Sequence, residues 1–394
     1  MADWPIDEFD GKTVLQNARK PYMDMLASKG RTGLLTTVPA GFHPGSEVAN
    51  MTVMGYDVSK DFEGRGVLEA ANIGVDIKPG QMGMRCNIIC IENGLIKNHS
   101  AGHLSTEEAA PLIESLQKEL GGNGVNFYKG IQYRHLLVVD GGNKQLLCTP
   151  PHDVPMQPFR PLMIKPLEPE AEYTAKRLND IILRSQEILA KHPVNLKRIS
   201  EGKDPANSIW PWSPGYRPMM KTMNEMFPFI KNSTVISAVD LIKGIGHYAG
   251  MKVPDIVGAT GLFDTNYENK AKTAIEALRT DDFVYVHVEA PDEAGHEGNY
   301  RLKNRTVEDL DSRLIGPIFE EVKGWNEPVA IAVLPDHPTP CAHRTHTSDP
   351  IPFLIYYPGI EPDSVSHFDE VSCKSGGYGH IEGTQFINLF FNSK

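Results

Sequence analysis

Three separated groups of Asp and His residues, together with one serine in a turn, are the residues of this chain best suited to chemistry. The groups are Asp292-Glu-Ala-Gly-His296, Asp336-His337 and His346, and the serine is Ser46 in the run His43-Pro-Gly-Ser-Glu47. Carboxylates and imidazoles bind divalent metal ions, and a metal-bound serine hydroxyl can attack a phosphoryl group. The combination predicts a two-metal site with a serine nucleophile.

Asp292 and His296 are four residues apart, so on a helical turn both side chains point to one face and can share one ion. This spacing is common by chance, and a surface aspartate beside a half-buried histidine is the simpler interpretation of the pair alone. The apolar run 284–288 directly before it, which is typical of a strand, favours the functional interpretation.

Asp336 and His337 follow the apolar run 331–334. Adjacent ligands must point in different directions, which a sharp turn after a strand permits, and we expect them to share one ion with the oxygen of Ser46. Of the two nearby histidines, we take His346 as the ligand because it precedes the run into the last predicted strand. His343 is interpreted as a loop residue.

The serine assignment depends on the histidines, because Pro-Gly-Ser is also ordinary turn chemistry. Metal coordination would lower the pKa of the Ser46 hydroxyl without a separate general base. Mixed oxygen and nitrogen ligands predict two divalent ions, with Mn²⁺ as the first choice, Zn²⁺ as an alternative and Mg²⁺ as a poorer fit.

Four basic residues are candidates to bind the carboxylate or phosphate of a small phosphorylated substrate, since guanidinium groups bind such anions in a bidentate way. Exposed solubilising charge explains each of them singly at least as well. They are Arg85, Arg134, His135 and Lys243.

The elements that must position these residues form a repeating pattern of strand, loop and helix from residue 233 onward. This pattern predicts an α/β core with a mostly parallel sheet covered on both faces. Both acidic groups lie just after predicted strands, where open α/β sheets place their sites. The predicted strands are 234–239, 283–288, 329–334 and 353–357, and a capping box at 306–309 predicts a helix to Val322.

A smaller α+β domain is predicted at 66–164, inserted into a discontinuous core of 1–65 and 165–394. Its Pro-rich end, 155–169, is interpreted as a linker. In the core we expect a helix at 13–28, a strand at 33–38 and a long helix at 173–191. In the insert we expect strands at 84–91 and 133–140, a turn at Asn93-Gly94, and a helix from the capping box at 105–108.

Composition limits the partners. The chain has 394 residues and a net charge of -11, so its surface as a whole would repel nucleic acid and anionic membranes. No apolar run is long enough to span a membrane, and the polar, acidic start does not resemble a signal peptide. Five sparse cysteines favour a reducing cytoplasm, with Cys86 and Cys90 as buried strand residues. The sequence leaves the oligomeric state open.

With these residues, the chain resembles the archaeal-type, cofactor-independent phosphoglycerate mutases of the alkaline phosphatase superfamily. The resemblance covers essentially the whole chain. A subgroup proposed to be homoserine kinases is closely similar, and the runs 150–154 and 207–212 resemble that subgroup equally well. The specific stretches are Pro44–Asn50 with Met54–Asp57, Leu104–Glu108, Tyr133–His135, Gly258–Gly261, Asp292–His296 and Asp336-His337.

The resemblance implies that Ser46 accepts the phosphoryl group and returns it to the other hydroxyl of bound glycerate. It implies one metal on Asp292, His296 and His346. A second metal would lie on Ser46, Asp336, His337 and one more aspartate. The inserted domain would close over the substrate with Arg85 and Arg134.

In the family, a short apolar strand ending in Gly-Asp-Gly supplies that further aspartate, and Met1 corresponds to the position just after it. We do not expect Asp3 to replace this ligand. We therefore expect the chain as given to lack a core strand, to bind its second metal poorly and to be weakly active.

Four functions remain open from the sequence. The first is an isomerase that interconverts 3-phosphoglycerate and 2-phosphoglycerate. The second is an ATP-dependent homoserine kinase that uses the same site. The sequence has no P-loop motif, but this fold would not need one. The third is a metal-dependent phosphatase or sulfatase, and the fourth is an inactive scaffold.

Overall fold

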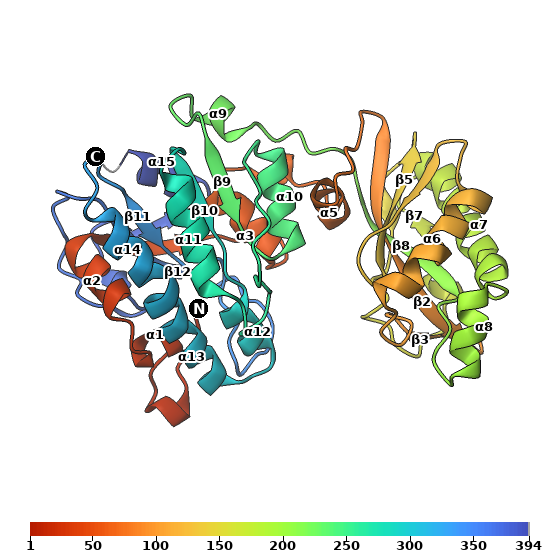
Figure 1. Cartoon of the computed structure of the whole chain (residues 1–394), viewed down its shortest axis with the longest axis horizontal. Coiled ribbons are helices and arrows are strands. Elements are labelled where there is room, and N and C mark those ends of the chain that lie inside the picture. The colour runs from red at the N-terminus through yellow and green to blue at the C-terminus, as the bar shows by residue number, and fades with distance from the viewer. Residues whose placement is uncertain (393–394) are drawn as a thin grey trace. The chain divides into compact units, whose positions relative to one another are not determined.

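The computed structural model describes residues 1–392, which fold into two compact units (Figure 1). Unit 1 combines Met1–Phe62 with the chain from Met220 onward, and unit 2 is Glu63–Met219. Each unit has its own sheets and its own hydrophobic core.

The strands of unit 1 lie in two separate sheets. The first has the order β11-β12-β1-β13, in which β12 runs antiparallel to both of its neighbours and β1 runs parallel to β13. The second consists of the parallel strands β9 and β10. The strands are β1 Arg31–Thr36, β9 Ser233–Ile236, β10 Phe283–Val286, β11 Ile331–Val333, β12 Ile351–Tyr356 and β13 His380–Glu382.

Helices cover the strands of unit 1, with α11 and α13 on the viewer's side in Figure 1. Their buried faces join one core with β12, which includes Ala271 of α11, Val307 of α13 and Leu354 of β12. The helices are α1 Val14–Asn17, α2 Pro21–Lys29, α3 Ser46–Val53, α4 Val58–Asp61, α9 Met223–Met226, α10 Asp240–Tyr248, α11 Tyr267–Leu278, α12 Ala290–His296, α13 Tyr300–Leu310, the π-helical turn η4 Asp311–Ile315, α14 Gly316–Val322 and α15 Gln385–Phe391.

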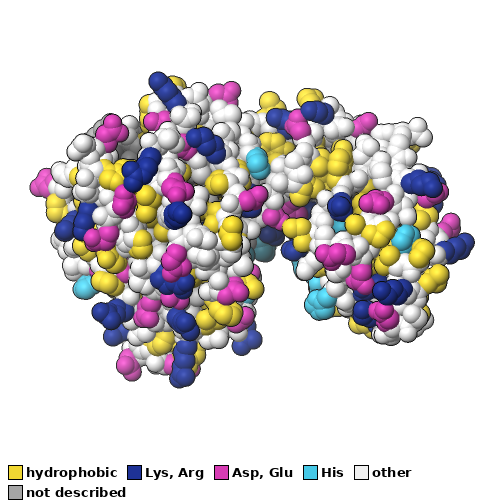
Figure 2. Space-filling model, viewed as in Figure 1, with side chains coloured by type: hydrophobic (Ala, Val, Ile, Leu, Met, Phe, Trp, Pro, Cys, Tyr) yellow, Lys and Arg dark blue, Asp and Glu magenta, His cyan; other side chains and the backbone are white. Residues whose placement is uncertain are grey.

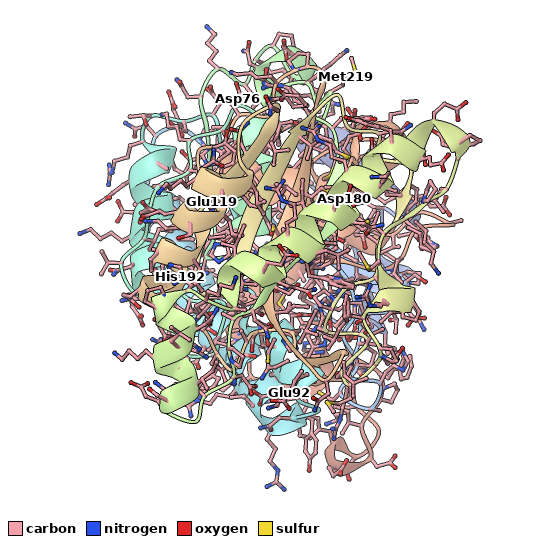
Figure 3. The ribbon with its side chains drawn as sticks, turned by 90° about the vertical axis from the view of Figure 1, so that its right-hand side faces the viewer. Asp76, Glu92, Glu119, Asp180, His192 and Met219 are labelled. Carbon is pink, nitrogen blue, oxygen red and sulfur yellow. The ribbon has the colours of Figure 1, made fainter. Side chains whose placement is uncertain are left out.

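Unit 2 has a continuous antiparallel sheet with the order β3-β2-β5-β4, and β8 pairs with the other edge of β2. Helices α6 and α7 pack against each other, and Figure 3 shows them, with Glu119 and Asp180, on the same side of the unit. The elements are α5 Arg65–Asn72, β2 Gln81–Glu92, β3 Leu95–Asn98, α6 Thr106–Leu120, β4 Val125–Tyr128, β5 Arg134–Asp140, β6 Leu146–Leu147, β7 Lys165–Pro166, α7 Glu172–Leu189, α8 Pro193–Ser200 and β8 Ser208–Gly215.

The predicted end of the insert at residue 164 is wrong, because the second unit continues to Met219. The Pro-rich segment is not a linker, since β7 within it pairs with β6. The long helix α7 packs on β8, and β8 pairs with β2, so both elements bury their apolar side chains in unit 2.

Two predicted helix boundaries are also corrected. The helix expected at 13–28 is broken into α1 and α2, because Pro21 disfavours a helical conformation at the residue before it. The capping box expected at Thr306 lies inside α13, where the Thr306 hydroxyl donates to the carbonyl of Lys303. Asn299 caps this helix instead, accepting a hydrogen bond from the N–H of Leu302.

Several local signals are confirmed. Ser105 and Glu108 form the predicted capping box at the start of α6. Asn93 and Gly94 both have positive φ angles, of 51° and 78°, in the turn that joins β2 to β3. Cys86 and Cys90 are buried and free. The predicted strands around 33–38, 84–91 and 133–140 and from 233 onward are present with shifted ends.

The surface carries charges of both signs. Figure 2 shows Lys and Arg side chains interspersed with Asp and Glu on the visible faces of both units. Within residues 1–392, no helix has the length and apolar character needed to cross a membrane.

Candidate active site

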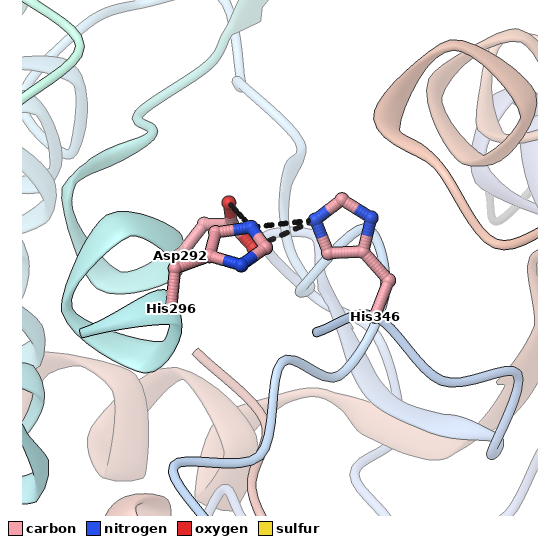
Figure 4. A group of neighbouring side chains, drawn as sticks. All are labelled: Asp292, His296 and His346. Atoms are coloured by element: carbon pink, nitrogen blue, oxygen red, sulfur yellow. Dashed lines mark hydrogen bonds and ion pairs between the residues drawn. The ribbon is translucent and has the colours of Figure 1, made fainter. Parts of the chain in front are cut away.

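Asp292, His296 and His346 converge on one point in unit 1 (Figure 4). The Nε2 atoms of the two histidines are 2.9 Å apart, and they lie 3.1 Å (His296) and 3.5 Å (His346) from the carboxylate oxygens of Asp292. Two nitrogen ligands of a tetrahedral ion are separated by about 3.3 Å, given metal–nitrogen bonds of about 2.0–2.1 Å. The arrangement therefore has the scale of a metal site.

Backbone carbonyls orient both imidazole rings. The Nδ1 atom of His296 lies 3.1 Å from the carbonyl oxygen of Arg344, and Nδ1 of His346 lies 3.3 Å from that of Pro44. With Nδ1–H donating to a carbonyl, the Nε2 lone pair faces the shared point. Metal-binding histidines are held by this kind of contact, so the residues fit a divalent cation.

Ser46, Asp336 and His337 form a second cluster in unit 1, buried more deeply than the first. Ser46 is the first residue of α3, and its Oγ lies 3.1 Å from Nε2 of His337. Asp336 Oδ2 lies 3.5 Å from the same nitrogen. The exposed fractions are 6% for Ser46 and 1% for His337, so these polar groups meet away from bulk water.

Asn50 lies one helical turn after Ser46 and links the backbone of Ser46 to Asp336 through hydrogen bonds. Its amide nitrogen donates to the carbonyl of Ser46 at 2.8 Å and to Asp336 Oδ2 at 3.0 Å. Its oxygen accepts from the hydroxyl of Tyr285 at 2.6 Å. The hydroxyl of Thr37, just after β1, holds the backbone carbonyl of Asp336. Asn50 thus holds the carboxylate of Asp336, Thr37 holds its backbone and Tyr285 orients Asn50.

A close approach of α12 to the chain at Thr339 positions Asp292. The Thr339 hydroxyl donates to Asp292 Oδ1. A Cβ atom on Gly295 would lie 2.3 Å from the carbonyl oxygen of Thr339, so only glycine permits this contact. The glycine in the motif Asp292-Glu-Ala-Gly-His296 therefore supports the site sterically.

The two clusters adjoin. The rings of His337 and His346 are 4.0 Å apart between centroids, and His337 Nδ1 lies 4.0 Å from Asp292 Oδ1. The structure thus brings together all six residues predicted for metal binding or nucleophilic attack, from segments separated by up to 300 residues.

The protonation preferences fit cation binding. Burial by itself raises the pKa of Asp292, but hydrogen bonds with His296 and His346 outweigh it and hold that pKa well below its usual range. The hydrogen bond with Asp292 raises the pKa of His296 to about 9. Burial lowers the pKa of His337. Binding of a metal ion at Nε2 requires a neutral imidazole, so metal binding and protonation of His296 would compete.

Glu289 and Glu293 lie beside Asp292 and add further carboxylates. Burial, followed by repulsion from Asp292 and Asp336, raises the pKa of Glu289 well above its usual value. Burial also raises the pKa of Glu293. A bound cation would stabilise this local excess of acidic groups.

Arg85 and Arg134 lie in unit 2 among other cationic and aromatic groups. The guanidinium of Arg85 stacks 4.3 Å above the Trp212 ring, and its Nε lies 2.8 Å from Glu69. Burial lowers the pKa of Arg85, and repulsion from Arg65 and Arg134 adds to that effect. Neighbouring guanidinium groups of this kind form a place for an anion.

The other two basic candidates receive less support. His135 is only 5% exposed on β5, and its Nδ1 accepts a hydrogen bond from the N–H of Gly130. We therefore interpret it as a core residue. Lys243 lies on α10 of unit 1, and its ammonium group is 3.3 Å from Asp255.

Sequence reasoning missed several residues of the site. Asn50 lay in a stretch that carried the resemblance, but nothing in its type marked it as the partner of Asp336. Thr339 and Tyr285 had no signal at all, because their roles depend on contacts across the fold.

Asp3 does not replace the further aspartate. Its carboxylate is paired with Nζ of Lys303 at 2.8 Å and accepts hydrogen bonds from the N–H of Cys341. Both charged side chains are almost fully buried, so this pair is a structural contact.

Fold and site together define an α/β protein with a serine beside a cluster of Asp and His residues at the carboxyl ends of its strands. A sequence profile described as 2,3-bisphosphoglycerate-independent phosphoglycerate mutase matches residues 27–195. A protein of that name from Methanosarcina acetivorans is 50% identical over 391 residues, covering 99% of this chain and 96% of the relative. A Geobacter sulfurreducens protein named as a probable member is 42% identical, covering 100% and 97%.

Solved structures agree with these sequence matches. A Pyrococcus horikoshii protein superposes with a TM-score of 0.84 at 29% identity, covering 100% of this chain and 94% of the other. The cofactor-independent phosphoglycerate mutase from Thermoplasma acidophilum superposes with a TM-score of 0.70 at 26% identity, covering 99% and 95%. The chain belongs to the family of 2,3-bisphosphoglycerate-independent phosphoglycerate mutases.

Proposed function

We propose that this chain interconverts 3-phosphoglycerate and 2-phosphoglycerate through a phosphoserine at Ser46. The observation that carries the proposal is the position of the Ser46 hydroxyl, 3.1 Å from His337 and beside the cluster of Asp292, His296 and His346. Relatives that align over the whole chain bear the mutase name, and these names give no support to a homoserine kinase.

The reaction needs two transfers at one oxygen. In the first, Ser46 Oγ bonds to phosphorus as the bond between phosphorus and the C3 oxygen of the substrate breaks. In the second, the C2 oxygen of the bound glycerate bonds to phosphorus and Ser46 Oγ leaves. The proton that Ser46 loses on attack passes to the departing C3 oxygen, and the proton that the C2 hydroxyl loses passes to Ser46 Oγ as it leaves. Both acceptors of the phosphoryl group are alcohol oxygens, so no phosphate is released to water.

Residues of unit 1 prepare this oxygen for the reaction. Ser46 opens α3, so the free N–H groups of the first helical turn and the positive end of the helix dipole lie at the transferred phosphoryl group. Asn50 holds the serine backbone and Asp336 together. These contacts fix the serine before substrate arrives, which removes an entropic cost of reaction.

The metal-binding residues divide into two sets that share the site. We assign Asp292, His296 and His346 to one ion, and Ser46, Asp336 and His337 to a second. The mixed carboxylate and imidazole donors favour Mn²⁺, with Zn²⁺ or Mg²⁺ as alternatives. A bound divalent ion would lower the pKa of the Ser46 hydroxyl and neutralise the charge of the phosphate.

Arg85 and Arg134 are assigned to the carboxylate or phosphate of the substrate. Their guanidinium groups belong to a cationic neighbourhood with Arg65, and Trp212 supports Arg85 through its ring face. A bidentate contact from such a group supplies both affinity and orientation.

The test is ³¹P NMR of the Mn²⁺-loaded protein with 3-phosphoglycerate and no nucleotide. We expect a 2-phosphoglycerate signal to grow without free phosphate, and no change with Ser46→Ala. Release of inorganic phosphate would indicate a phosphatase instead. An unchanged spectrum, followed by phosphorylation of homoserine when ATP is supplied, would indicate the kinase.

A further inference from the structure

The hydroxyl of Thr339 contacts both metal-binding clusters of unit 1. Thr339 follows His337 by two residues and is buried, with an exposed fraction of 2%. Its hydroxyl donates a hydrogen bond to Asp292, and its Oγ1 lies 3.4 Å from Nδ1 of His337. Asp292 belongs to the set of residues assigned to one ion, and His337 belongs to the set assigned to the other. One hydroxyl group therefore connects the two sets.

This hydroxyl has a single proton, which decides the direction of both hydrogen bonds. An ionised carboxylate only accepts hydrogen bonds, so the O–H of Thr339 is directed toward Asp292. The oxygen of Thr339 can then only accept a hydrogen bond from His337. His337 accordingly carries its proton on Nδ1, because the hydrogen bond at one ring nitrogen sets the state of the other. Its Nε2 lone pair faces Ser46 Oγ at 3.1 Å.

The backbone and the methyl group of Thr339 are both held in place. Its carbonyl oxygen accepts a hydrogen bond at 2.8 Å from Nζ of Lys303, whose exposed fraction is 0%. Helix α12 packs directly on its side chain, since a Cβ atom on Gly295 would lie only 3.0 Å from the Thr339 methyl carbon. Threonine is also stiff about its first side-chain torsion. The direction of the hydroxyl is therefore fixed by the fold before any ion binds.

A buried threonine beside an aspartate does not by itself indicate a function, as Thr234 of β9 illustrates. Its exposed fraction is also 2%, and its hydroxyl donates to Asp281 at 2.5 Å. Asp281 is in turn paired with Lys252 at 2.6 Å, so this contact is structural. Thr339 differs because both of its partners are candidate metal ligands.

We propose that Thr339 is a positioning residue that couples the two metal-binding sets. Its hydroxyl orients the carboxylate of Asp292 and keeps His337 in the form whose Nε2 can bind a cation beside Ser46. Hydrogen bonds to metal ligands from outside the ligand set contribute about 10- to 100-fold to metal affinity. The proposal rests on the assignment of the metal-binding residues made under the proposed function.

The test uses two substitutions of Thr339 that separate the hydroxyl from the methyl group. Thr339→Val keeps the shape of the side chain and removes the hydroxyl, whereas Thr339→Ser keeps the hydroxyl and removes the methyl group. Thr234→Val is the matched control, because it removes a buried hydroxyl from a carboxylate outside the candidate site. Circular dichroism and urea unfolding show whether each variant folds.

Calorimetric titration with Mn²⁺ measures the effect on the set that contains Asp292. We expect Thr339→Val to bind Mn²⁺ about 10- to 100-fold more weakly, and Thr339→Ser to lose less than about 10-fold. Thr234→Val should bind Mn²⁺ as the original chain does, even where its stability is lower. Unchanged affinity in Thr339→Val, or an equal loss in Thr234→Val, would overturn the proposal.

Nitrogen-15 NMR of the metal-free protein, labelled at histidine, measures the effect on His337. At about pH 8, above the ordinary pKa of histidine, we expect the proton on Nδ1 in the original chain and in Thr339→Ser. In Thr339→Val we expect it to move partly to Nε2, which lies 3.5 Å from Asp336 Oδ2. The signals are assigned by their absence in His337→Asn.

The same proton position in all three proteins, or a proton on Nε2 in the original chain, would overturn the coupling of the two sets. Neither measurement depends on turnover. A chain that shows both effects but does not interconvert the phosphoglycerates would contradict the proposed function and leave the role of Thr339 intact.

Discussion

Unit 1 and unit 2 hold their charged side chains in opposite ways. In unit 1, Asp292, Asp336 and Glu289 gather with histidines around one point, where acidic groups outnumber cations. In unit 2, Arg85 lies near Arg65 and Arg134. Burial is the main cause that lowers the pKa of Arg85, and repulsion from these two arginines lowers it further. The first arrangement suits the binding of cations and the second suits the binding of anions, which are the two roles proposed for these residues.

The units also differ in how complete their sheets are. Every strand of the main sheet of unit 2 is paired through β2 and β5, and its core is fully buried. The sheet of unit 1 is interrupted beside the candidate site. The candidate site thus lies in the unit whose described strands form two separate sheets.

Ser46→Ala should have the largest effect. We expect kcat to fall by at least about 10³-fold, because the variant lacks the oxygen that carries the phosphoryl group. Initial rates of 2-phosphoglycerate formation measure this. Ser59→Ala, an exposed serine of α4, is the control and should keep full activity. Retained turnover in Ser46→Ala would exclude a phosphoserine at this residue.

Asp292→Asn should come next. The change keeps the size of the side chain but removes the charge that both His296 and His346 contact. We expect metal affinity to fall by at least about 100-fold, since even indirect contacts of a metal site contribute 10- to 100-fold. Calorimetric titration with Mn²⁺ measures the affinity.

Glu297→Gln, an exposed carboxylate just after α12, is the matched control for Asp292→Asn. It changes the net charge equally but lies outside the cluster. Equal losses of affinity in the two variants would show that general charge, and not the site, attracts the cation.

Arg85→Ala should act on substrate binding in unit 2. Loss of a charged hydrogen bond costs about 1.5–3 kcal/mol, so we expect KM to rise by about 10- to 100-fold with a smaller change in kcat. Arg184→Ala, on the exposed face of α7, is the control. A fall in kcat at unchanged KM would contradict a role in binding the anion.

His135→Leu should have the smallest effect, and only at acidic pH. Burial lowers the pKa of His135 from its ordinary value of 6.5 to about 3, so the unfolded chain binds its proton first as pH falls. Folding stability is unaffected above pH 6.5 and declines below it, by about 1.4 kcal/mol at pH 5.5. The decline continues toward pH 3.

Urea unfolding at pH 7.5 and 5.5 measures this difference. The original chain should lose more stability between the two pH values than His135→Leu does. His367→Leu, an exposed histidine of unit 1, should behave like the original chain. The same pH dependence in His135→Leu would mean that the buried ring does not cause it.

Sequence patterns predicted local structure well and boundaries between units poorly. The capping box at Ser105 and the turn at Asn93-Gly94 depend on residues within four positions, so their signals are complete in the sequence. The amphipathic helix α7 was predicted within two residues of its ends but placed in the wrong unit. Amphipathicity indicates that a helix buries one face, but not which sheet receives it.

The candidate site shows the same division. Residue type and spacing selected the candidate metal ligands, because few other side chains bind metal ions. These candidates are Asp292, His296, Asp336, His337 and His346. Asn50, Tyr285 and Thr339 escaped notice, since an amide or hydroxyl is ordinary until a distant segment meets it. The sequence offered His135 as a candidate to bind the substrate but did not show that its side chain is buried, because that burial is a property of the sheet.

The sequence by itself determined the family, the candidates for the reactive side chains and the local caps and turns, because each depends on residue chemistry or on short-range contacts. Only the tertiary structure decided that His296 and His346 face each other across 50 residues, that α7 and β8 complete unit 2, and that β10 and β11 lie in different sheets. These outcomes depend on the packing of surfaces distant in sequence, which no local pattern encodes.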